Sequence, residues 1–307
     1  MSQAYQTRKQ AGETYFIQSY AKINLTLDIL GRRTDGYHEL ATIMQTVDLY
    51  DTICLTATEE ETVDVVCSRP ELNNADNLVV KAAQKVRERL GLTQGIKIEL
   101  QKRIPVAAGL AGGSSNASAI LLALQRWWNL PLSSTDLLAI AASLGSDVPF
   151  FLRGGLALCE GRGEEISPLP AHWPTSMRWI LLLKPAIGVA TASVFRNLPP
   201  TDYTDGTHSR MVCTALRTQS ELRREHLHNG LERGVVAHYP EVAAAREALL
   251  QAGAEPHLSG SGPTLFATFA KLEDAAQVQQ YLLARSYEVY LTRAIFPNDE
   301  NVQYYHY

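Results

Sequence analysis

Two stretches near the start of the chain alternate apolar and polar residues with a period of two. They are residues 15–30, YFIQSYAKINLTLDIL, and residues 42–58, TIMQTVDLYDTICLTAT. Side chains two positions apart share one face of a strand, so the pattern predicts two half-buried strands. The Asp35-Gly36 pair in the connecting segment 31–40 favours a turn. Residues 62–68 and 95–104 predict two further strands.

Helical spacing follows in three places in the first half. Residues 77–90 predict a helix with Asp76 as a possible N-cap and Gly91 just past its end. Residues 114–128 predict a helix after a glycine-rich turn. Residues 133–145 predict another, with a Ser/Thr start and a stop at Gly145. Residues 146–170 favour a loop and a hairpin.

In the second half of the chain, segments with the two-residue period of strands alternate with segments that have the spacing of helices. It predicts strands at 177–185, 265–270 and 287–295, helices at 240–254 and 272–286, and an exposed polar loop at 201–209. This order is typical of an α+β sandwich with helices on one face of a sheet. Proline and polar residues at 168–174 indicate a boundary between two domains, residues 1–170 and 171–307.

The composition, 46% apolar and 20% charged over 307 residues, is that of a globular protein. A net charge of −4 provides no general basic field, which argues against nucleic acid or an anionic membrane as the main partner. Residues 1–14 are polar and lack the apolar core of a secretory signal, so we expect a cytoplasmic protein. The scattered cysteines, Cys54, Cys67, Cys159 and Cys213, are expected to be reduced and mostly buried thiols.

The glycine-rich segment 109–119, GLAGGSSNASA, permits two interpretations. Unpaired backbone N–H groups at a helix N-terminus bind anions, so the segment could cradle phosphate. It could equally be a tight turn whose Ser114 or Ser115 caps the helix. It matches neither the nucleotide P-loop, because it has no lysine, nor the dinucleotide-binding motif. A second Gly-Ser turn, residues 258–267, is usually a loop when alone, but together the two turns favour a shared ligand cleft.

Two charged residues lie in otherwise apolar surroundings. Lys22 shares a strand face with Asn24, and its head group is either in water at a strand edge or paired. Asp147 follows a helix and precedes Pro149, where it could cap a loop. If Lys22 and Asp147 meet in the fold, each offsets the desolvation of the other, and the pair could handle a hydroxyl proton.

Three segments in this order, residues 21–40, 105–119 and 258–267, resemble the three motifs of the GHMP kinase superfamily. Its members include galactokinase, homoserine kinase, mevalonate kinase and phosphomevalonate kinase. The resemblance implies a two-domain α+β fold with mixed and antiparallel sheets, in which the N-terminal domain binds ATP and the C-terminal domain is a ferredoxin-like sandwich. It implies phosphorylation of an alcohol by ATP with Mg²⁺, in a cleft between the domains.

Within the superfamily, GRRTDGYHEL (31–40) and LGSDVPFFLRGG (144–155) are most similar to kinases that act on a cytidine diphosphate-linked alcohol in isoprenoid precursor synthesis. The resemblance implies that Asp147 is the base and Lys22 orients it. It implies substrate contacts for Asn24, Tyr37, His38, Thr191 and Phe195, with the aromatic group around the cytosine. Asn77 would contact the nucleoside of ATP, and no residue is assigned to the metal. The implied phosphate-binding residues are Pro105, Val106, Ala107, Ala108, Gly109, Leu110, Ala111, Gly112, Gly113, Ser114 and Ser115.

Two positions depart from the pattern of the superfamily. Ala111 stands where many members have glycine, which requires a negative φ if the position is to be unstrained. Gly230 stands where members often have aspartate, so a capping role there is in doubt. Two rival functions remain: a GHMP kinase for another alcohol such as homoserine or mevalonate, and a nucleotide-binding member without catalysis. The DGYH segment argues against the first, and the presence of both Lys22 and Asp147 against the second.

Overall fold

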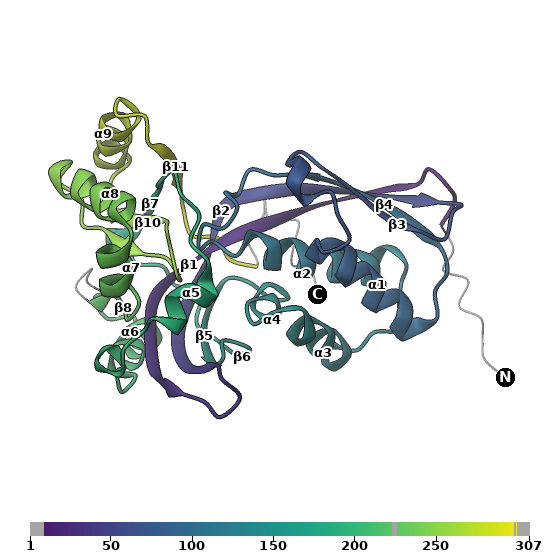
Figure 1. The fold of residues 1–307 in the computed structure, drawn as a ribbon, viewed down its shortest axis with the longest axis horizontal. Coiled ribbons are helices and arrows are strands. Elements are labelled where there is room, and N and C mark those ends of the chain that lie inside the picture. The colour runs from purple at the N-terminus through teal and green to yellow at the C-terminus, as the bar shows by residue number, and fades with distance from the viewer. Residues whose placement is uncertain (1–8, 223–225, 298, 300–307) are drawn as a thin grey trace.

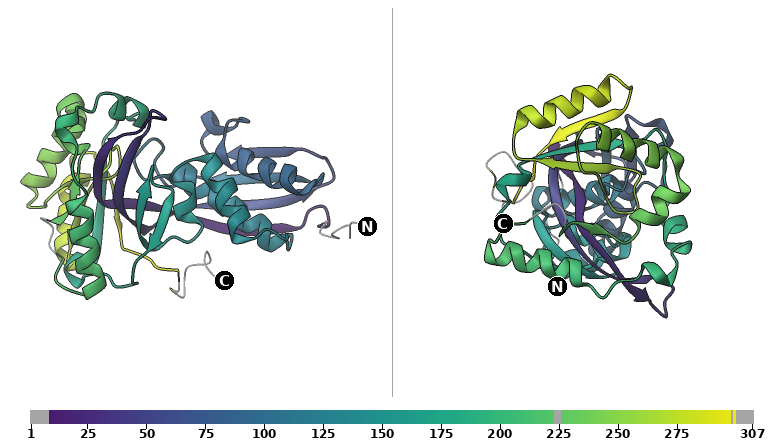
Figure 2. Two further views of the ribbon diagram at one scale, coloured as in Figure 1. Left: turned by 90° about the horizontal axis from the view of Figure 1, so that it is seen from below. Right: turned by 90° about the vertical axis from the view of Figure 1, so that its left-hand side faces the viewer.

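The computed structural model describes residues 9–222, 226–297 and 299. Figure 1 shows an elongated molecule in which two long strands, β1 (Thr14–Arg32) and β2 (His38–Thr58), run from one end toward the other. The two views in Figure 2 agree with this arrangement. The alternating segments at the start of the chain are therefore confirmed as strands. Their hairpin turn contains Gly36, whose φ of +88° only glycine adopts readily.

Seven strands of the described chain form the first sheet, in the order β3-β4-β2-β1-β8, with β5 paired to β2 and β6 to β5. Helices α1 and α2 pack on this sheet and α3 packs on them (Figure 1). The bounds are β3 (Val63–Cys67), β4 (Gly95–Gln101), β5 (Leu156–Gly161), β6 (Glu165–Pro168), β8 (His228–Asn229), α1 (Leu78–Leu90), α2 (Gly112–Trp127), α3 (Ser134–Leu144) and α4 (Val148–Phe151).

The helix ends follow from local hydrogen bonds. Ser133 and Asp136 form a capping box at the start of α3, as the Ser/Thr start predicted. The prediction that Asp76 caps α1 is wrong. The cap is Asn77, whose side chain accepts a hydrogen bond from Val79 N at 3.1 Å, while Asp76 pairs with Lys81.

The second sheet has the order β11-β7-β10-β9, and all its neighbours are antiparallel. With α8 and α9 on one face, it has the ferredoxin-like arrangement that the resemblance implied. The other face packs against β1 and β2, which is why β7 is apolar on both sides. The bounds are β7 (Trp179–Lys184), β9 (His257–Leu258), β10 (Leu265–Phe269), β11 (Glu288–Thr292), α8 (Pro240–Gln251) and α9 (Leu272–Leu283).

Residues between β7 and α8 return to the first sheet. They form α5 (Thr191–Arg196), α6 (Thr207–Thr218), β8 and α7 (Glu232–His238), and β8 pairs in parallel with β1. The expectation of an exposed loop at 201–209 is wrong for its second part, because α6 begins at Thr207. Ser209 is buried, and its hydroxyl donates to the carbonyl oxygen of Ala41 at 2.8 Å.

Gly230 has no capping role, because the N-cap of α7 is Leu231 and no described side chain caps this helix. The side chain of Asn229 accepts from Leu231 N at 2.9 Å, while Gly230 N donates to the carbonyl oxygen of Leu27. Three short 3₁₀ turns, η1 (Pro70–Leu72), η2 (Thr175–Met177) and η3 (Pro200–Asp202), complete the described elements.

The cysteines are free thiols, as expected. Cys67, Cys159 and Cys213 are buried and Cys54 is partly exposed. Burial raises the pKa of the Cys159 thiol far above its ordinary value, so this group stays protonated. Among the residues described, no helix is both long and apolar enough to cross a lipid bilayer.

Candidate active site

The two glycine-rich turns and the charged residues singled out in the sequence line one cavity of about 1380 Å³. Of the site residues expected from the sequence, all but Leu110 and Ser115 line it. The side chain of Leu110 is buried in the core, and its carbonyl oxygen accepts a hydrogen bond from the backbone N of Lys22 at 3.2 Å. Ser115 is fully buried within α2.

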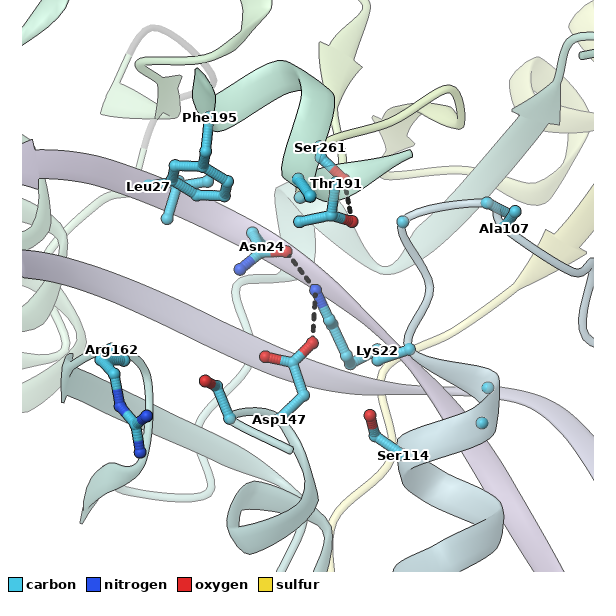
Figure 3. A pocket seen from close by; sticks show the side chains of 18 of the residues that line it. Lys22, Asn24, Leu27, Ala107, Ser114, Asp147, Arg162, Thr191, Phe195 and Ser261 are labelled. Atoms are coloured by element: carbon cyan, nitrogen blue, oxygen red, sulfur yellow. Dashed lines mark hydrogen bonds and ion pairs between the residues drawn. The ribbon is translucent and has the colours of Figure 1, made fainter. Parts of the chain in front are cut away.

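Lys22, Asn24 and Asp147 meet at the centre of the cavity (Figure 3). Lys22 Nζ lies 3.6 Å from Asp147 Oδ2 and donates to Asn24 Oδ1 at 2.6 Å. Asn24 in turn donates to Thr42 Oγ1 at 2.8 Å. Asp147 makes no cap hydrogen bond to α4, so its carboxylate is directed to Lys22 and the cavity instead. The paired interpretation of Lys22 is therefore the one that the structure supports.

A β-bulge in β1 decides which side chains face this cavity. The pairing register with β2 shifts between Asn24 and Thr26, which leaves Leu25 as the extra residue. Because the alternation of faces reverses there, Leu27 lines the cavity with Lys22 and Asn24. Thr26 and Asp28 point away from it, toward Ser209.

The two glycine-rich turns touch through their backbones. A Cβ on Gly109 would lie 2.2 Å from the carbonyl oxygen of Ser259, and the φ of Gly109 is +73°. A Cβ on Gly260 would lie 3.3 Å from Lys22 Nζ, and the φ of Gly260 is +56°. Side chains at these positions would separate the turns, which explains why both segments need glycine. Ser261 Oγ lies 2.8 Å from Thr191 Oγ1 and ties the second turn to α5.

The N-terminus of α2 opens into the cavity without a side-chain cap. The cap residue is Ala111, and α2 begins at Gly112, so the prediction that Ser114 or Ser115 caps the helix is wrong. The first-turn amides have no intrahelical partner, and the helix dipole adds positive potential there. This is the geometry of an anion site. The side chain of Ser114 lies on the first turn (Figure 3).

Ala111 adopts the left-handed conformation with a φ of +54°, so the condition for an unstrained alanine at this position is not met. Ala107 in the same loop has a φ of +50°. For a residue with a Cβ this conformation costs about 1–2 kcal/mol. The contacts of the loop with the second glycine-rich turn offset that strain.

The sequence reasoning missed a buried charge pair beneath this helix terminus. Lys102 Nζ contacts the carboxylate of Asp51 and donates to Asn116 Oδ1 at 3.1 Å. A Cβ on Gly112 would lie 3.1 Å from Lys102 Nζ, so this cation sits directly behind the helix start. Asp51 also accepts from the backbone N of Arg103 and Ile104. The available signal was Asp51, a charged residue at a buried position within an alternating strand.

Aromatic residues gather at the end of the cavity near the β1–β2 hairpin. The rings of His38 and Phe195 are 5.2 Å apart between centroids, and His38 Nε2 lies 3.4 Å from the hydroxyl of Tyr203. Burial, with a smaller contribution from Arg32, lowers the pKa of His38. The imidazole is therefore neutral near pH 7. Tyr203 was not singled out from the sequence, because it lies in the segment that was interpreted as an exposed loop.

Arg162 is a second residue that sequence reasoning missed. Its guanidinium lies 4.9 Å from the ring centroid of Tyr37, and its Nε donates to Glu164 Oε1 at 3.1 Å. In the described part of the chain the two terminal nitrogens have no hydrogen-bond partner, and the side chain lines the cavity (Figure 3). The arrangement offers a fixed cationic fork to an anionic ligand.

Comparison with known families gives matches in both halves of the chain. The GHMP kinases N terminal domain matches residues 77–155, and the GHMP kinases C terminal domain matches residues 214–289. A crystal structure of homoserine kinase from Cytophaga hutchinsonii superposes with a TM-score of 0.71 at 20% identity, over 93% of this chain and 96% of that one. At that identity the likeness supports the fold.

Relatives with a higher sequence identity than this homoserine kinase share one name. The chain is 39% identical to 4-diphosphocytidyl-2-C-methyl-D-erythritol kinase of Brevibacillus brevis over 91% of this chain and 96% of the relative. It is 43% identical to the protein of that name in Geobacillus kaustophilus, over 81% and 86%. A crystal structure of 4-(cytidine 5'-diphospho)-2C-methyl-D-erythritol kinase superposes with a TM-score of 0.77 at 30% identity, over 91% and 99%. This chain therefore belongs to the GHMP kinases and, within them, to the 4-diphosphocytidyl-2-C-methyl-D-erythritol kinase family.

Proposed function

We propose that the chain transfers the γ-phosphoryl group of ATP to the 2-hydroxyl of 4-diphosphocytidyl-2-C-methyl-D-erythritol, giving the 2-phosphate and ADP. The reaction belongs to the methylerythritol phosphate route to isoprenoid precursors. The observation that carries the proposal is the Lys22–Asp147 pair at the centre of one cavity, between an anion-binding helix terminus and an aromatic group. A phosphoryl donor and a nucleotide-linked acceptor can thus reach the same carboxylate.

Asp147 acts as the base in this reaction. Its carboxylate takes the proton of the acceptor hydroxyl as that oxygen forms a bond to the γ-phosphorus and ADP leaves. The Lys22 ammonium, held by Asn24, stabilises the negative charge that develops on the acceptor oxygen. Phosphoryl transfer needs positioning and charge neutralisation more than covalent help from the protein, and this pair supplies both.

The phosphates of ATP bind at the N-terminus of α2. The backbone amides of the loop from Gly109 to Ser114 would donate to the phosphate oxygens. Gly109 and Gly112 allow this loop to pack closely on Ser259 and Ile104. Lys102 adds positive potential from behind the helix start, although Asp51 offsets part of it. The adenosine of ATP would lie beside Asn77 in the same cavity. Leu72, Leu78 and Leu100 provide apolar contacts there.

The donors in the cavity suit Mg²⁺, which prefers oxygen ligands and keeps several waters and phosphate oxygens. The hydroxyl of Ser114 lines the cavity at the start of α2 and would hold the ion together with phosphate oxygens and water. When bound, Mg²⁺ neutralises negative charge on the β- and γ-phosphates. No other step in the proposal depends on it.

The cytidine end of the substrate lies against Tyr37, His38 and Phe195. Stacking on an aromatic side chain contributes about 1–3 kcal/mol per base. The neutral His38 can both donate and accept hydrogen bonds at the edge of cytosine, and Thr191 lies at the start of the same helix as Phe195. This aromatic group favours a cytidine-linked acceptor over homoserine or mevalonate, which have no ring to stack.

We further propose that residues 1–170 form the ATP-binding domain and residues 171–307 the second domain, with the reaction in the cleft between them. The cavity supports this division, because it is lined by β1, β2 and the α2 loop from the first part and by α5 and the second glycine-rich turn from the other.

Purified protein with ATP and Mg²⁺ tests the proposal. We expect ADP release with 4-diphosphocytidyl-2-C-methyl-D-erythritol and none above background with homoserine or mevalonate. Release with either of those alcohols alone would favour another GHMP kinase. Release with none of the three, from protein that still binds ATP, would favour a non-catalytic member.

A further inference from the structure

Outside the ATP and substrate cavity, three elements bring metal-ligating side chains together. Asp28 of β1, His208 of α6 and His228 of β8 each offer a ligand atom, and these atoms lie within 4.8 Å of one another. None of the three residues lines the cavity described above. The bulge at Leu25 separates the two sites, because it turns Asp28 away from the cavity.

Asp28 is a fully buried carboxylate whose described partners are all neutral. Oδ1 accepts from Thr204 Oγ1 and Oδ2 from Ser209 N, each at 2.7 Å. Within the described residues, no Lys or Arg nitrogen forms an ion pair with it. An ionised carboxylate in such surroundings is costly unless a cation lies nearby. The two histidines are the side chains that face it.

The two imidazoles are stacked, with ring centroids 3.8 Å apart and an angle of 16° between their planes. Two positive charges at that distance repel, so the pair cannot easily provide two imidazolium ions. The Nε2 of His228 is buried and has no hydrogen-bond partner among the described residues. A buried imidazole nitrogen without a described partner, close to a buried carboxylate, is a donor set that suits a metal ion.

We propose that Asp28, His208 and His228 bind one Zn²⁺ ion, with water as the fourth ligand. Two imidazoles and a carboxylate suit zinc, whereas Mg²⁺ prefers oxygen ligands alone. Around a tetrahedral zinc ion neighbouring ligand atoms are about 3.3 Å apart, as the usual bond lengths of 2.0–2.1 Å require. The ligand atoms now lie within 4.8 Å of one another, so binding draws the set inward by at most about 1.5 Å, which tilting of the two rings can provide. Thr204 and Ser209 already orient the carboxylate through hydrogen bonds, as metal-ligating carboxylates require.

The ion would join three segments that are far apart in the sequence. It would fasten the start of α6 to β1 and β8, and thereby fix the segment that follows Tyr203. Tyr203 contacts His38 in the substrate cavity. The proposed role is structural: the ion holds one wall of that cavity in place without entering it.

Metal titration tests the site directly. Untagged full-length protein, freed of metal with a chelator, is titrated with Zn²⁺ alone by calorimetry and with Co²⁺ alone by visible absorption. We expect one ion per chain, the visible bands of four-coordinate Co²⁺, and a higher Tm with Zn²⁺ because the ligand binds only the folded state. His208→Gln and His228→Gln should each weaken binding at least tenfold.

His238→Gln is the matched control. His238 is exposed and bonds to the carbonyl oxygen of Gly234, so its loss should leave the titration unchanged. Circular dichroism checks that each variant is folded; if His228→Gln is not, His208→Gln and Asp28→Asn carry the test. Absence of stoichiometric binding in the wild type, or wild-type binding in both histidine variants, would overturn the proposal. The readout uses neither ATP nor an acceptor, so its failure would leave the proposed kinase function untouched.

Discussion

The ammonium group of Lys22 lies 3.6 Å from Oδ2 of Asp147, with 4% of the Lys22 side chain and 30% of the Asp147 side chain exposed. The cation is thus held behind the carboxylate, and the carboxylate faces the space that a ligand can enter. A hydroxyl that approaches Asp147 therefore comes within reach of the Lys22 charge. The Lys22–Asp147 pair thus lies between the part of the cavity proposed to bind the phosphates of ATP and the part proposed to bind the acceptor.

Replacement of Lys22 by Met should lower kcat about 100-fold, because the reaction loses one group that stabilises developing negative charge. The affinity for ATP should change little. Steady-state ADP release and calorimetric ATP binding measure the two quantities, with the exposed Lys81→Met as control. Wild-type kcat in Lys22→Met would exclude the role that we assign to this ammonium group.

Replacement of Phe195 by Ala should raise KM for the cytidyl substrate by about 10-fold or more, the equivalent of a lost stacking contact of about 1–3 kcal/mol. ATP binding should stay intact. Phe195 also packs against the core of the second sheet, so Tm is measured in parallel. Equal losses for ATP and the cytidyl substrate would mean that the ring acts through the core.

Replacement of Arg162 by Met keeps the length of the side chain and removes the cationic fork. We expect a KM for the cytidyl substrate raised about 10-fold, within the range of one charge-assisted hydrogen bond, and an unchanged kcat. The defect should shrink at high salt, because the wild type loses this electrostatic contribution there. Arg153→Met, at an exposed position nearby in the chain, is the control. If both variants behave alike, Arg162 does not contact the substrate.

Replacement of Lys102 by Met should destabilise the fold by about 3–5 kcal/mol, because Asp51 is left as a buried charge without its partner. The double variant Asp51→Asn, Lys102→Met should lose less than the sum of the single losses. Chemical denaturation measures the three free energies of unfolding. Strictly additive losses would contradict an interaction between the two side chains.

Substrate binding should depend on the charge of His38. Burial lowers its pKa below the ordinary value of 6.5, so the folded protein binds fewer protons there than the unfolded chain. The His38 contribution to stability is therefore present above pH 6.5 and is lost as the pH falls through that value toward the folded-state pKa. KM for the cytidyl substrate should rise over the same acidic range, and His38→Asn should remove that dependence. A wild-type KM independent of pH from 7 down to 5 would argue against the contact.

Local patterns predicted those parts of the fold that depend on local forces. Period-two alternation gave β1 and β2, and the Ser133 start gave the capping box of α3. The long-range pair of Asp51 and Lys102 could not be predicted as a pair, because Asp51 lies within β2 and Lys102 lies just past β4, 51 residues later. The bulge at Leu25 was equally hidden, since it arises from the pairing with β2 and involves no glycine.

In the candidate site too, local relationships could be predicted from the sequence and features set by tertiary contacts could not. Lys22 and Asn24 could be placed on one strand face because they are two positions apart, and the family motifs supplied the rest of the predicted set. The positive φ of Ala111 could not be predicted, because tertiary contacts impose it against the local preference of alanine. Tyr203 lines the cavity between η3 and α6, in the part of the segment that was interpreted as an exposed loop.

The turnover of Asp147→Asn tests the central claim most directly. The variant keeps the size of the side chain but has no carboxylate to accept the hydroxyl proton. We expect ADP release with 4-diphosphocytidyl-2-C-methyl-D-erythritol to fall by about 10²- to 10⁴-fold, as for loss of a general base, while ATP affinity stays close to that of the wild type. Near-normal turnover of a folded Asp147→Asn protein would contradict the account.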